Sequence, residues 1–203
     1  MYIQKSLNTY IDDLASRSGV PGGGSAAALT ASLGMALSTM VMNFTSNSKR
    51  YKKVAGRVKQ LLRKNELLRK KVQLLIDKDV VVFLKVQDAF KLAKQHPQKY
   101  GMLQKSLKDA VGVPFEICRL CSEAMRLCAE IAGIGNVNLI TDTGDAAYLL
   151  EAAFKAAELN VRINLKFLGD GKFVANKKKE LKKMATAVAK MRKQIIKKVE
   201  GYL

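Results

Sequence analysis

The feature that most constrains the fold is a long run without a charged side chain, which extends from Ser18 to Ser48. Within it, Ser25 to Phe44 has the length of a helix that could cross a lipid bilayer. Its residues are mostly Ala, Ser, Thr, Gly and Met, and no second segment of this kind follows. These properties favour a helix that is buried on all sides inside a bundle or a dimer over a membrane helix.

The rest of the chain shows apolar residues at helical spacing nearly throughout, with no alternating strand pattern and no internal repeat. Pro114 should start a new segment or kink its helix. We therefore predict one all-α domain over residues 1–203, an antiparallel up-and-down bundle of about six helices, one of them long. The expected helices cover residues 3–14, 25–44, 49–94, 102–132 and 145–168. After a turn at Gly169–Gly171, a lysine-rich sixth helix is expected to carry Leu181 to Val199 toward the C-terminus.

The charge of the chain is strongly positive, with 36 Lys and Arg against 17 Asp and Glu, a formal net charge of +19. This balance attracts polyanions, but it is equally compatible with lysine-rich, solvated helix faces. The basic runs Lys49–Lys71 and Lys172–Lys198 contain only Tyr51 and Phe173 as aromatic residues and no helix-turn-helix signature. Nucleic acid is therefore not the expected partner.

Three cysteines and one histidine limit the chemistry that the chain can perform. Cys118, Cys121 and Cys128 lie on one face of one expected helix, which indicates core packing rather than a zinc site. The histidine, His96, lies beside a proline in a polar connection. We expect no metal, no disulfide framework and a reducing cytoplasm. Carboxylates, hydroxyls, amides and lysines are left to carry any catalysis.

A glycine-rich turn, Pro21 to Ser25, leads into the uncharged helix. Bare backbone amides at a helix N-terminus can bind an anion. The turn lacks the Lys and Ser or Thr of a phosphate-binding P-loop, and no strand precedes it as in a dinucleotide-binding fold. A tight helix–helix turn and a ligand-binding turn both remain open from the spacing alone.

Two aspartates in the long helix are candidates for acid–base chemistry. Asp77 and Asp79 point to nearly opposite sides of a helix, so they cannot act as a pair within it. Asp79 adjoins Val80–Leu84, which is apolar on every side and is expected to be buried. A carboxylate at that boundary is a candidate acid or base with a shifted pKa. The alternative is an ordinary surface carboxylate beside Lys78.

Four segments together resemble one protein family. They are Pro-Gly-Gly-Gly-Ser at 21–25, Asp-Lys-Asp-Val-Val-Val-Phe at 77–83, Gly-Asn-Val-Asn-Leu-Ile-Thr-Asp at 135–142 and Asn-Val-Arg-Ile-Asn-Leu at 160–165. In order and approximate spacing they are similar to the C-terminal domain of formiminotransferase-cyclodeaminase. They are also similar to free-standing bacterial cyclodeaminases and methenyltetrahydrofolate cyclohydrolases.

This resemblance implies an all-helical homodimer that acts on a tetrahydrofolate derivative, with no cofactor beyond that substrate. In one reaction N10 closes on the formimino carbon of 5-formiminotetrahydrofolate and ammonia leaves. In the other, water opens the 5,10-methenyl bridge to give 10-formyltetrahydrofolate. The glutamate tail of a folate, which can carry several carboxylates, would be drawn by the positive potential.

The resemblance also assigns candidate site residues. Asp79 and Asp142 are the predicted catalytic residues. The predicted substrate-binding residues are Gly23, Gly24, Ser25, Asn136, Asn138, Arg162 and Asn164. The alternative function is a non-catalytic basic helical module of the same fold that binds an anionic partner such as nucleic acid.

Overall fold

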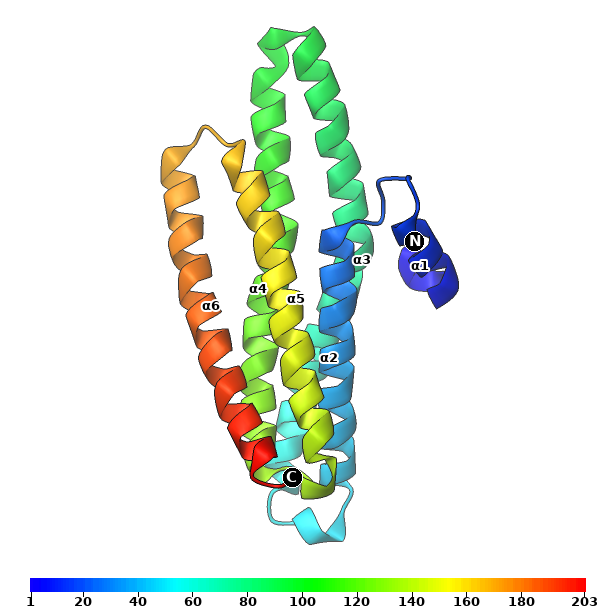
Figure 1. The fold of residues 1–203 in the computed structure, drawn as a ribbon, viewed down its shortest axis with the longest axis vertical. Coiled ribbons are helices and arrows are strands. Elements are labelled where there is room, and N and C mark those ends of the chain that lie inside the picture. Colours follow the sequence, from blue (N-terminus) through cyan, green and yellow to red (C-terminus); the bar gives the residue numbers. More distant parts are fainter.

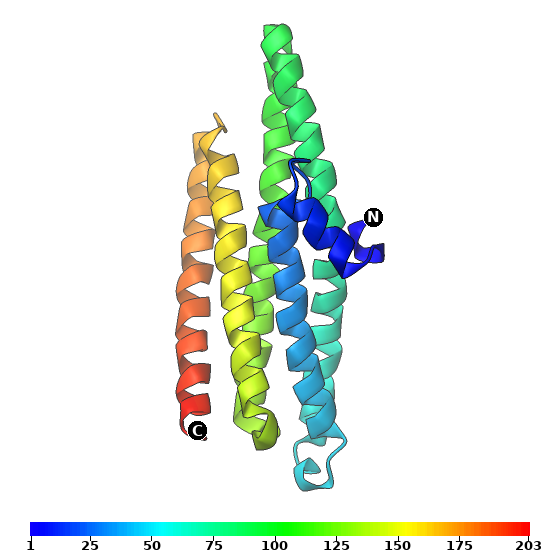
Figure 2. The ribbon, with the colours of Figure 1, turned by 45° about the vertical axis from the view of Figure 1, so that its right-hand side comes forward.

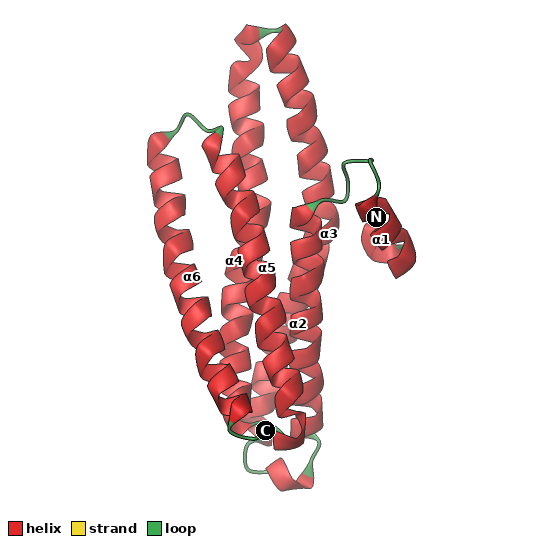
Figure 3. Cartoon of the chain, in the orientation of Figure 1, coloured by secondary structure: helices red, strands yellow, loops and turns green.

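The computed structural model describes all residues from Met1 to Leu203, and every regular element in it is a helix (Figures 1 and 3). The prediction of an all-α bundle with one long helix is confirmed. The α-helices are α1 (Leu7–Ala15), α2 (Gly23–Ser46), α3 (Ala55–Gln95), α4 (Tyr100–Ile134), α5 (Ile140–Lys166) and α6 (Gly171–Glu200). Short 3-10 helices lie at Tyr2–Gln4, Lys49–Tyr51, Pro97–Lys99 and Val137–Leu139.

The uncharged helix α2 lies in a corner of the bundle, where it packs against α3 and α5. Its small residues allow a close approach: a methyl group on Gly34 would lie 3.1 Å from both the Ala146 carbonyl oxygen and the Leu150 Cγ. By length and composition α2 could cross a membrane, but 56% of its most apolar window is buried in the bundle. The expectation of burial on all sides is wrong for one chain, because Leu33 and Phe44 are 52% and 58% exposed.

Helices α3 and α4 form a long antiparallel hairpin whose tip projects beyond the other helices (Figure 1). The projecting tip of this hairpin explains why a second prediction is wrong. Val80–Leu84 was expected to be buried, yet Val81, Phe83 and Leu84 are exposed. Near the projecting tip α3 is covered on fewer sides, so only Val82 of this segment packs against the core.

Pro114 does not break α4, which runs through it as one helix. A proline at this position cannot donate to the carbonyl of Ala110, four residues earlier. The Asn164 side chain of α5 supplies the missing donor, with its Nδ2 2.9 Å from the Ala110 oxygen. On the same helix, Cys118, Cys121 and Cys128 are buried in the core, as predicted.

The two outer helices complete the bundle. Helix α6 packs along α4 and α5 (Figure 2), and Arg192 on α6 pairs with Glu151 on α5 at 2.9 Å. The short helix α1 lies beside the bundle near the start of α2 (Figure 1). Only Tyr10 of this helix is buried, and Leu7, Ile11 and Leu14 are exposed.

Candidate active site

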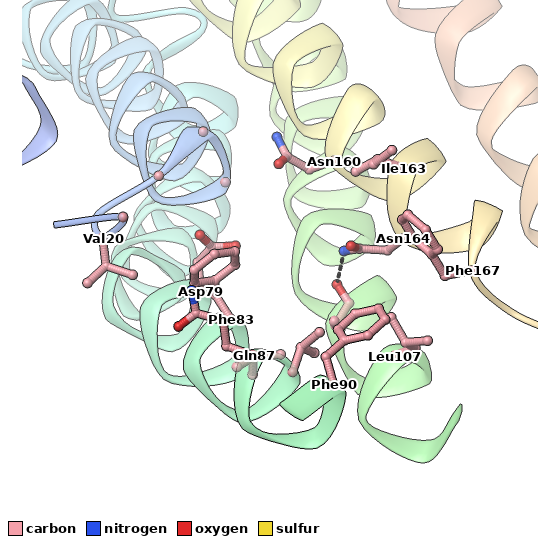
Figure 4. A pocket seen from close by; sticks show the side chains of 17 residues that line it. Val20, Asp79, Phe83, Gln87, Phe90, Leu107, Asn160, Ile163, Asn164 and Phe167 are labelled. Carbon is pink, nitrogen blue, oxygen red and sulfur yellow. Dashed lines mark hydrogen bonds between the residues drawn. The ribbon is translucent and has the colours of Figure 1, made fainter. Parts of the chain in front are cut away.

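A cavity of about 310 Å³ opens between four helices, at the end of the bundle where α2 begins (Figure 4). The turn before α2, the middle of α3, α4 and the last turns of α5 all contribute walls. One side is apolar and the other carries amides and one carboxylate. The lining residues are Gly19, Val20, Gly22, Gly23, Gly24, Asp79, Val82, Phe83, Val86, Gln87, Phe90, Leu107, Ala110, Asn160, Ile163, Asn164 and Phe167.

Asp79 is the one ionisable side chain in the lining of this cavity. Its Oδ2 accepts a hydrogen bond from the backbone N–H of Ser25 at 2.9 Å. Gly24 makes this approach possible: a methyl group there would lie 2.6 Å from Cγ and 2.8 Å from Oδ2 of Asp79. The glycine turn is therefore tight because the carboxylate of α3 occupies the space that a side chain would need.

Burial raises the pKa of Asp79 above the ordinary value for an aspartate, and the hydrogen bond from Ser25 opposes part of that rise. Desolvation disfavours the charged form, whereas an N–H donor favours it. A carboxyl group with a raised pKa exchanges protons closer to neutral pH than a surface aspartate does. This arrangement suits a group that accepts and returns a proton during a reaction.

The start of α2 adds a positive electrostatic contribution. Gly22 is the N-cap of α2 and no side chain caps this end. The first N–H groups of a helix have no partner inside the helix, and the helix dipole places partial positive charge there. Ser25 donates to Asp79, while Gly23 and Gly24 line the cavity beside it.

The apolar wall suits a flat ring system. Phe90 on α3 and Phe167 after α5 meet edge to face, with ring centroids 5.9 Å apart. Phe83, Val86 and Leu107 continue this wall toward Asp79. Pockets for small organic ligands combine such apolar surface with a few placed polar groups.

Asp77 has a different surrounding from Asp79. Its carboxylate accepts hydrogen bonds from the backbone N–H groups of Tyr2 and Ile3, and it does not line the cavity. It fastens the start of the chain to α3. Nearby, the hydroxyls of Tyr10 and Ser25 lie 3.0 Å apart in a buried contact, so the side chain of Ser25 faces α1 rather than the cavity.

Three predicted site residues lie at the other end of the bundle, so one chain does not bring Asn136, Asn138 and Asp142 to Asp79. The backbone N–H of Asn136 donates to Thr45 Oγ1 at 2.9 Å, at the end of α2. The N–H of Asn138 donates to Asn136 Oδ1 at 3.1 Å. Asp142 lies in the first turn of α5, where a carboxylate favours the helix dipole.

Arg162 also lies outside the cavity, although its neighbour Ile163 lines it. It faces a groove between α5 and α6 that also contains Lys166, Lys178 and Lys182. The ion pairs of these two helices involve other residues, namely Lys155, Lys177 and Arg192 with Glu151 and Glu180. Glu158 also lines the groove, which therefore holds four cations and one carboxylate, and none of the four cations forms an ion pair.

Several lining residues were not among the predicted site residues, including Asn160, Gln87, Phe90, Leu107 and Phe167. Helical spacing carried a signal for some of them. Asp79, Phe83 and Phe90 are separated by four and seven residues, and Asn160 and Asn164 by four, so each set shares one helix face. Leu107 has no such signal, because only the packing of α4 brings it here.

The fold and the cavity define an all-helical enzyme domain in which a half-buried carboxylate, held at a helix N-terminus, faces an apolar, aromatic wall. Comparison with known sequences agrees with this class. The sequence pattern described as formiminotransferase-cyclodeaminase matches residues 6–183. The chain belongs to this family of folate one-carbon enzymes, as its four motifs predicted.

Individual relatives support the assignment. The chain is 36% identical to a methenyltetrahydrofolate cyclohydrolase from Methylorubrum extorquens over 97% of both chains. It is 31% identical to the formimidoyltransferase-cyclodeaminase of Mus musculus over 84% of this chain but 32% of the mouse protein, so it spans about a third of that longer relative. A crystal structure of formiminotetrahydrofolate cyclodeaminase from Thermotoga maritima covers 99% of this chain with a TM-score of 0.93 and 32% identity.

Proposed function

We propose that this protein converts a one-carbon group between N5 and N10 of tetrahydrofolate, and that Asp79 is the acid–base catalyst. The reaction is either the cyclodeaminase ring closure or the cyclohydrolase ring opening. The observation that supports this most strongly is the half-buried carboxylate of Asp79, held by the Ser25 N–H against the glycine turn and facing an apolar wall.

One carboxylate can serve both reactions because both pass through a tetrahedral carbon beside a delocalised cation. In ring opening, Asp79 would accept a proton from the attacking water and return it to N5 as the C–N5 bond breaks. In ring closure, which starts from the protonated formimino group (–CH=NH2⁺), it would accept the N10 proton and pass it to that nitrogen, which then leaves as ammonia and generates the methenyl cation. Its negative charge would stabilise the cation at the same time.

The remaining lining would bind and orient the folate. The pterin ring fits the apolar side, between Phe83 and the Phe90–Phe167 pair. Asn160, Asn164 and Gln87 offer amide groups to its polar edge. No cofactor beyond the folate and no metal is required by this scheme. We place the protein in the cytoplasm, where its three buried cysteines would stay reduced.

A paired assay tests this function. Purified protein is given 5,10-methenyltetrahydrofolate and, separately, 5-formiminotetrahydrofolate, and the absorbance of the methenyl form is followed. We expect acceleration of at least one reaction, and a fall in kcat of about 10²-fold or more for Asp79→Asn. Asp77→Asn is the matched control, because it makes the same change two residues away at a carboxylate outside the cavity. Failure to accelerate either reaction would disprove the proposal.

Arg162 lies in the groove between α5 and α6 and not in the cavity, and there it can bind the tail of the substrate. A folate in the cavity would direct its glutamate tail past Ile163 and Phe167 toward solvent, and Arg162 and Lys166 are their neighbours on the helix. With four cations against the one carboxylate of Glu158, the groove has a net positive charge that matches a chain of carboxylates. A substrate with several γ-linked glutamates should therefore show a lower KM than one with a single glutamate, and added salt should reduce the difference.

We also propose that two chains pair through the outer face of α2 and α5. This face is apolar along its length and consists of Ala26, Leu29, Leu33, Ala36, Leu37, Met40, Phe44, Leu149, Ala152, Ala156, Leu159 and Ile163, all exposed or half-buried. An exposed, continuous apolar face of this length marks an interface. Leu33 lies near its centre, and we propose a two-fold axis there that is perpendicular to α2, which sets α2 antiparallel to its copy.

This pairing would also account for the motif at the far end of the bundle. An antiparallel arrangement brings the end of one α2, with Asn43, Asn47 and the Asn136 loop, beside the start of the other, where Asp79 lies. Asn136, Asn138 and Asp142 would then belong to the site of the partner chain. The resemblance that grouped them with Asp79 and their separation within one chain are both accounted for.

A further inference from the structure

Two consecutive glycines at the start of α2 each contact a polar side chain from another helix. Gly24 touches Asp79 of α3, as described above. Gly23 faces Asn160 of α5: a methyl group on Gly23 would lie 3.3 Å from Nδ2 and 3.7 Å from Oδ1 of that amide. The carboxylate and the amide thus both contact the first turn of α2, and both line the same cavity (Figure 4).

The amide of Asn160 is held in one orientation. Its Nδ2 donates to the carbonyl of Ala156, one turn earlier on α5, at 2.9 Å. An amide that donates through its nitrogen in this way leaves its oxygen as a free acceptor with two lone pairs. Asn164, one turn further along, is committed instead to the carbonyl that Pro114 leaves without a donor on α4. The hydrogen bond of Asn160 lies within one helix, so its loss should cost the fold less than the loss of the bond that Asn164 makes between two helices.

We propose that Asn160 is a further catalytic residue, which together with Asp79 holds the small molecule that enters or leaves the reacting carbon. This inference rests on the function proposed above. The entering molecule is water in ring opening, and the leaving molecule is ammonia in ring closure. Both are rich in hydrogen-bond donors, and both must be held in one orientation relative to the carbon.

Two acceptors that line the same cavity meet this need. When a water donates one hydrogen to Asp79 and the other to Asn160 Oδ1, a lone pair of its oxygen is directed at the methenyl carbon. Asp79 accepts the proton that is transferred, whereas Asn160 only accepts a hydrogen bond, so the proton balance of the reaction is unchanged. Ammonia formed in ring closure leaves between the same two acceptors. Holding reactants in such a geometry lowers the barrier without a new chemical step.

Two variants of Asn160 test this role. Asn160→Ala removes the acceptor, and we expect kcat to fall about 10- to 100-fold while KM changes little. Asn160→Asp keeps the shape and an acceptor oxygen but adds a charge opposite Asp79. Like charges raise the pKa of both carboxyls, so the acid limb of the pH profile of kcat should move to higher pH. Asn176→Asp is the charge-matched control on an exposed part of α6, and its pH profile should match the wild type.

The outcomes separate the two proposals. An active wild-type protein whose Asn160→Ala and Asn160→Asp variants keep the wild-type kcat and pH profile would overturn the role of Asn160 alone. A wild-type protein that converts neither folate would overturn the proposed function and this inference with it. If circular dichroism shows that Asn160→Ala does not fold, the pH profile of the isosteric Asn160→Asp variant decides the question.

Discussion

At the scale of single residues, two carboxylates of the same type, two positions apart, have been given different tasks by their surroundings. Asp77 accepts two backbone N–H groups and fixes the start of the chain. Asp79 lies in the cavity, where burial raises its pKa. Sequence reasoning expected Asp79 to be buried by the apolar residues that follow it. Those residues are largely exposed, and the burial comes instead from the glycine turn of α2, which periodicity within α3 could not reveal.

The raised pKa of Asp79 predicts a specific dependence of stability on pH. Because its ionised form is less favourable in the folded chain than in the unfolded chain, the contribution of Asp79 to the free energy of unfolding is highest below the ordinary carboxyl pKa and falls as pH rises through the raised pKa. Asp79→Asn removes this loss, so it should raise the melting temperature at neutral pH while abolishing activity. The gain is about 1.4 kcal/mol for each unit of pKa shift.

Thermal unfolding of the wild type and of Asp79→Asn checks this prediction. The measurements cover roughly pH 3 to 8, the interval over which carboxyl groups titrate. The difference in melting temperature should grow with pH and vanish at the acid end. A constant difference, or a variant that is less stable at neutral pH, would contradict the raised pKa. The loss of activity with a gain in stability would mark Asp79 as a functional rather than a structural residue.

At the scale of secondary-structure elements, the helices follow the apolar period closely, but their interruptions depend on neighbours. Pro114 was expected to start a new segment or kink its helix, and α4 runs through it because Asn164 of α5 bonds the carbonyl that the proline leaves open. A pattern within one helix cannot show a donor that comes from another. Similarly, α5 begins at Ile140 rather than near Asp145, because a 3-10 turn at Val137–Leu139 leads directly into it.

The pairing of Pro114 with Asn164 predicts coupled effects on stability. Asn164→Ala leaves the Ala110 carbonyl without a donor and should lower the free energy of unfolding by about 1–3 kcal/mol. In a Pro114→Ala background the restored backbone N–H can bond that carbonyl within α4, so the same change should cost much less. Urea unfolding of the four proteins in a double-mutant cycle measures the coupling. Equal costs in the two backgrounds would show that Asn164 does not compensate for the proline.

At the scale of the whole molecule, the class of fold was accessible from the sequence, whereas the grouping of the motifs was not. Successive helices of an up-and-down bundle run in opposite directions, so their connections alternate between its two ends. The turn before α2 and the loop between α4 and α5 consequently fall at opposite ends. The family motifs were expected to meet at one site. Within a single chain, the loop that begins at Asn136 lies at the end of the bundle opposite Asp79.

The outer face of α2 predicts the oligomeric state. Leu33→Glu places a charge near the proposed two-fold axis, where the partner chain brings the same charge. We expect the variant to sediment as a monomer while the wild type sediments as a dimer, with its helical circular dichroism retained. Lys178→Glu makes a charge change on the exposed surface of α6 and should leave the dimer intact. A Leu33→Glu variant that stays dimeric would place the interface elsewhere.

Because of the same apolar face, the stability of the folded chain should depend on the protein concentration. As long as the face is open, a chain exposes Leu33, Phe44 and their neighbours to water, and covering them stabilises the folded form. By mass action, the unfolding midpoint should therefore rise with protein concentration. Turnover per chain should likewise decline on dilution, because a solitary chain would lack the amide-rich end of its partner. In the proposed dimer, activity per chain would therefore depend on protein concentration and be highest when the chains are abundant enough to pair.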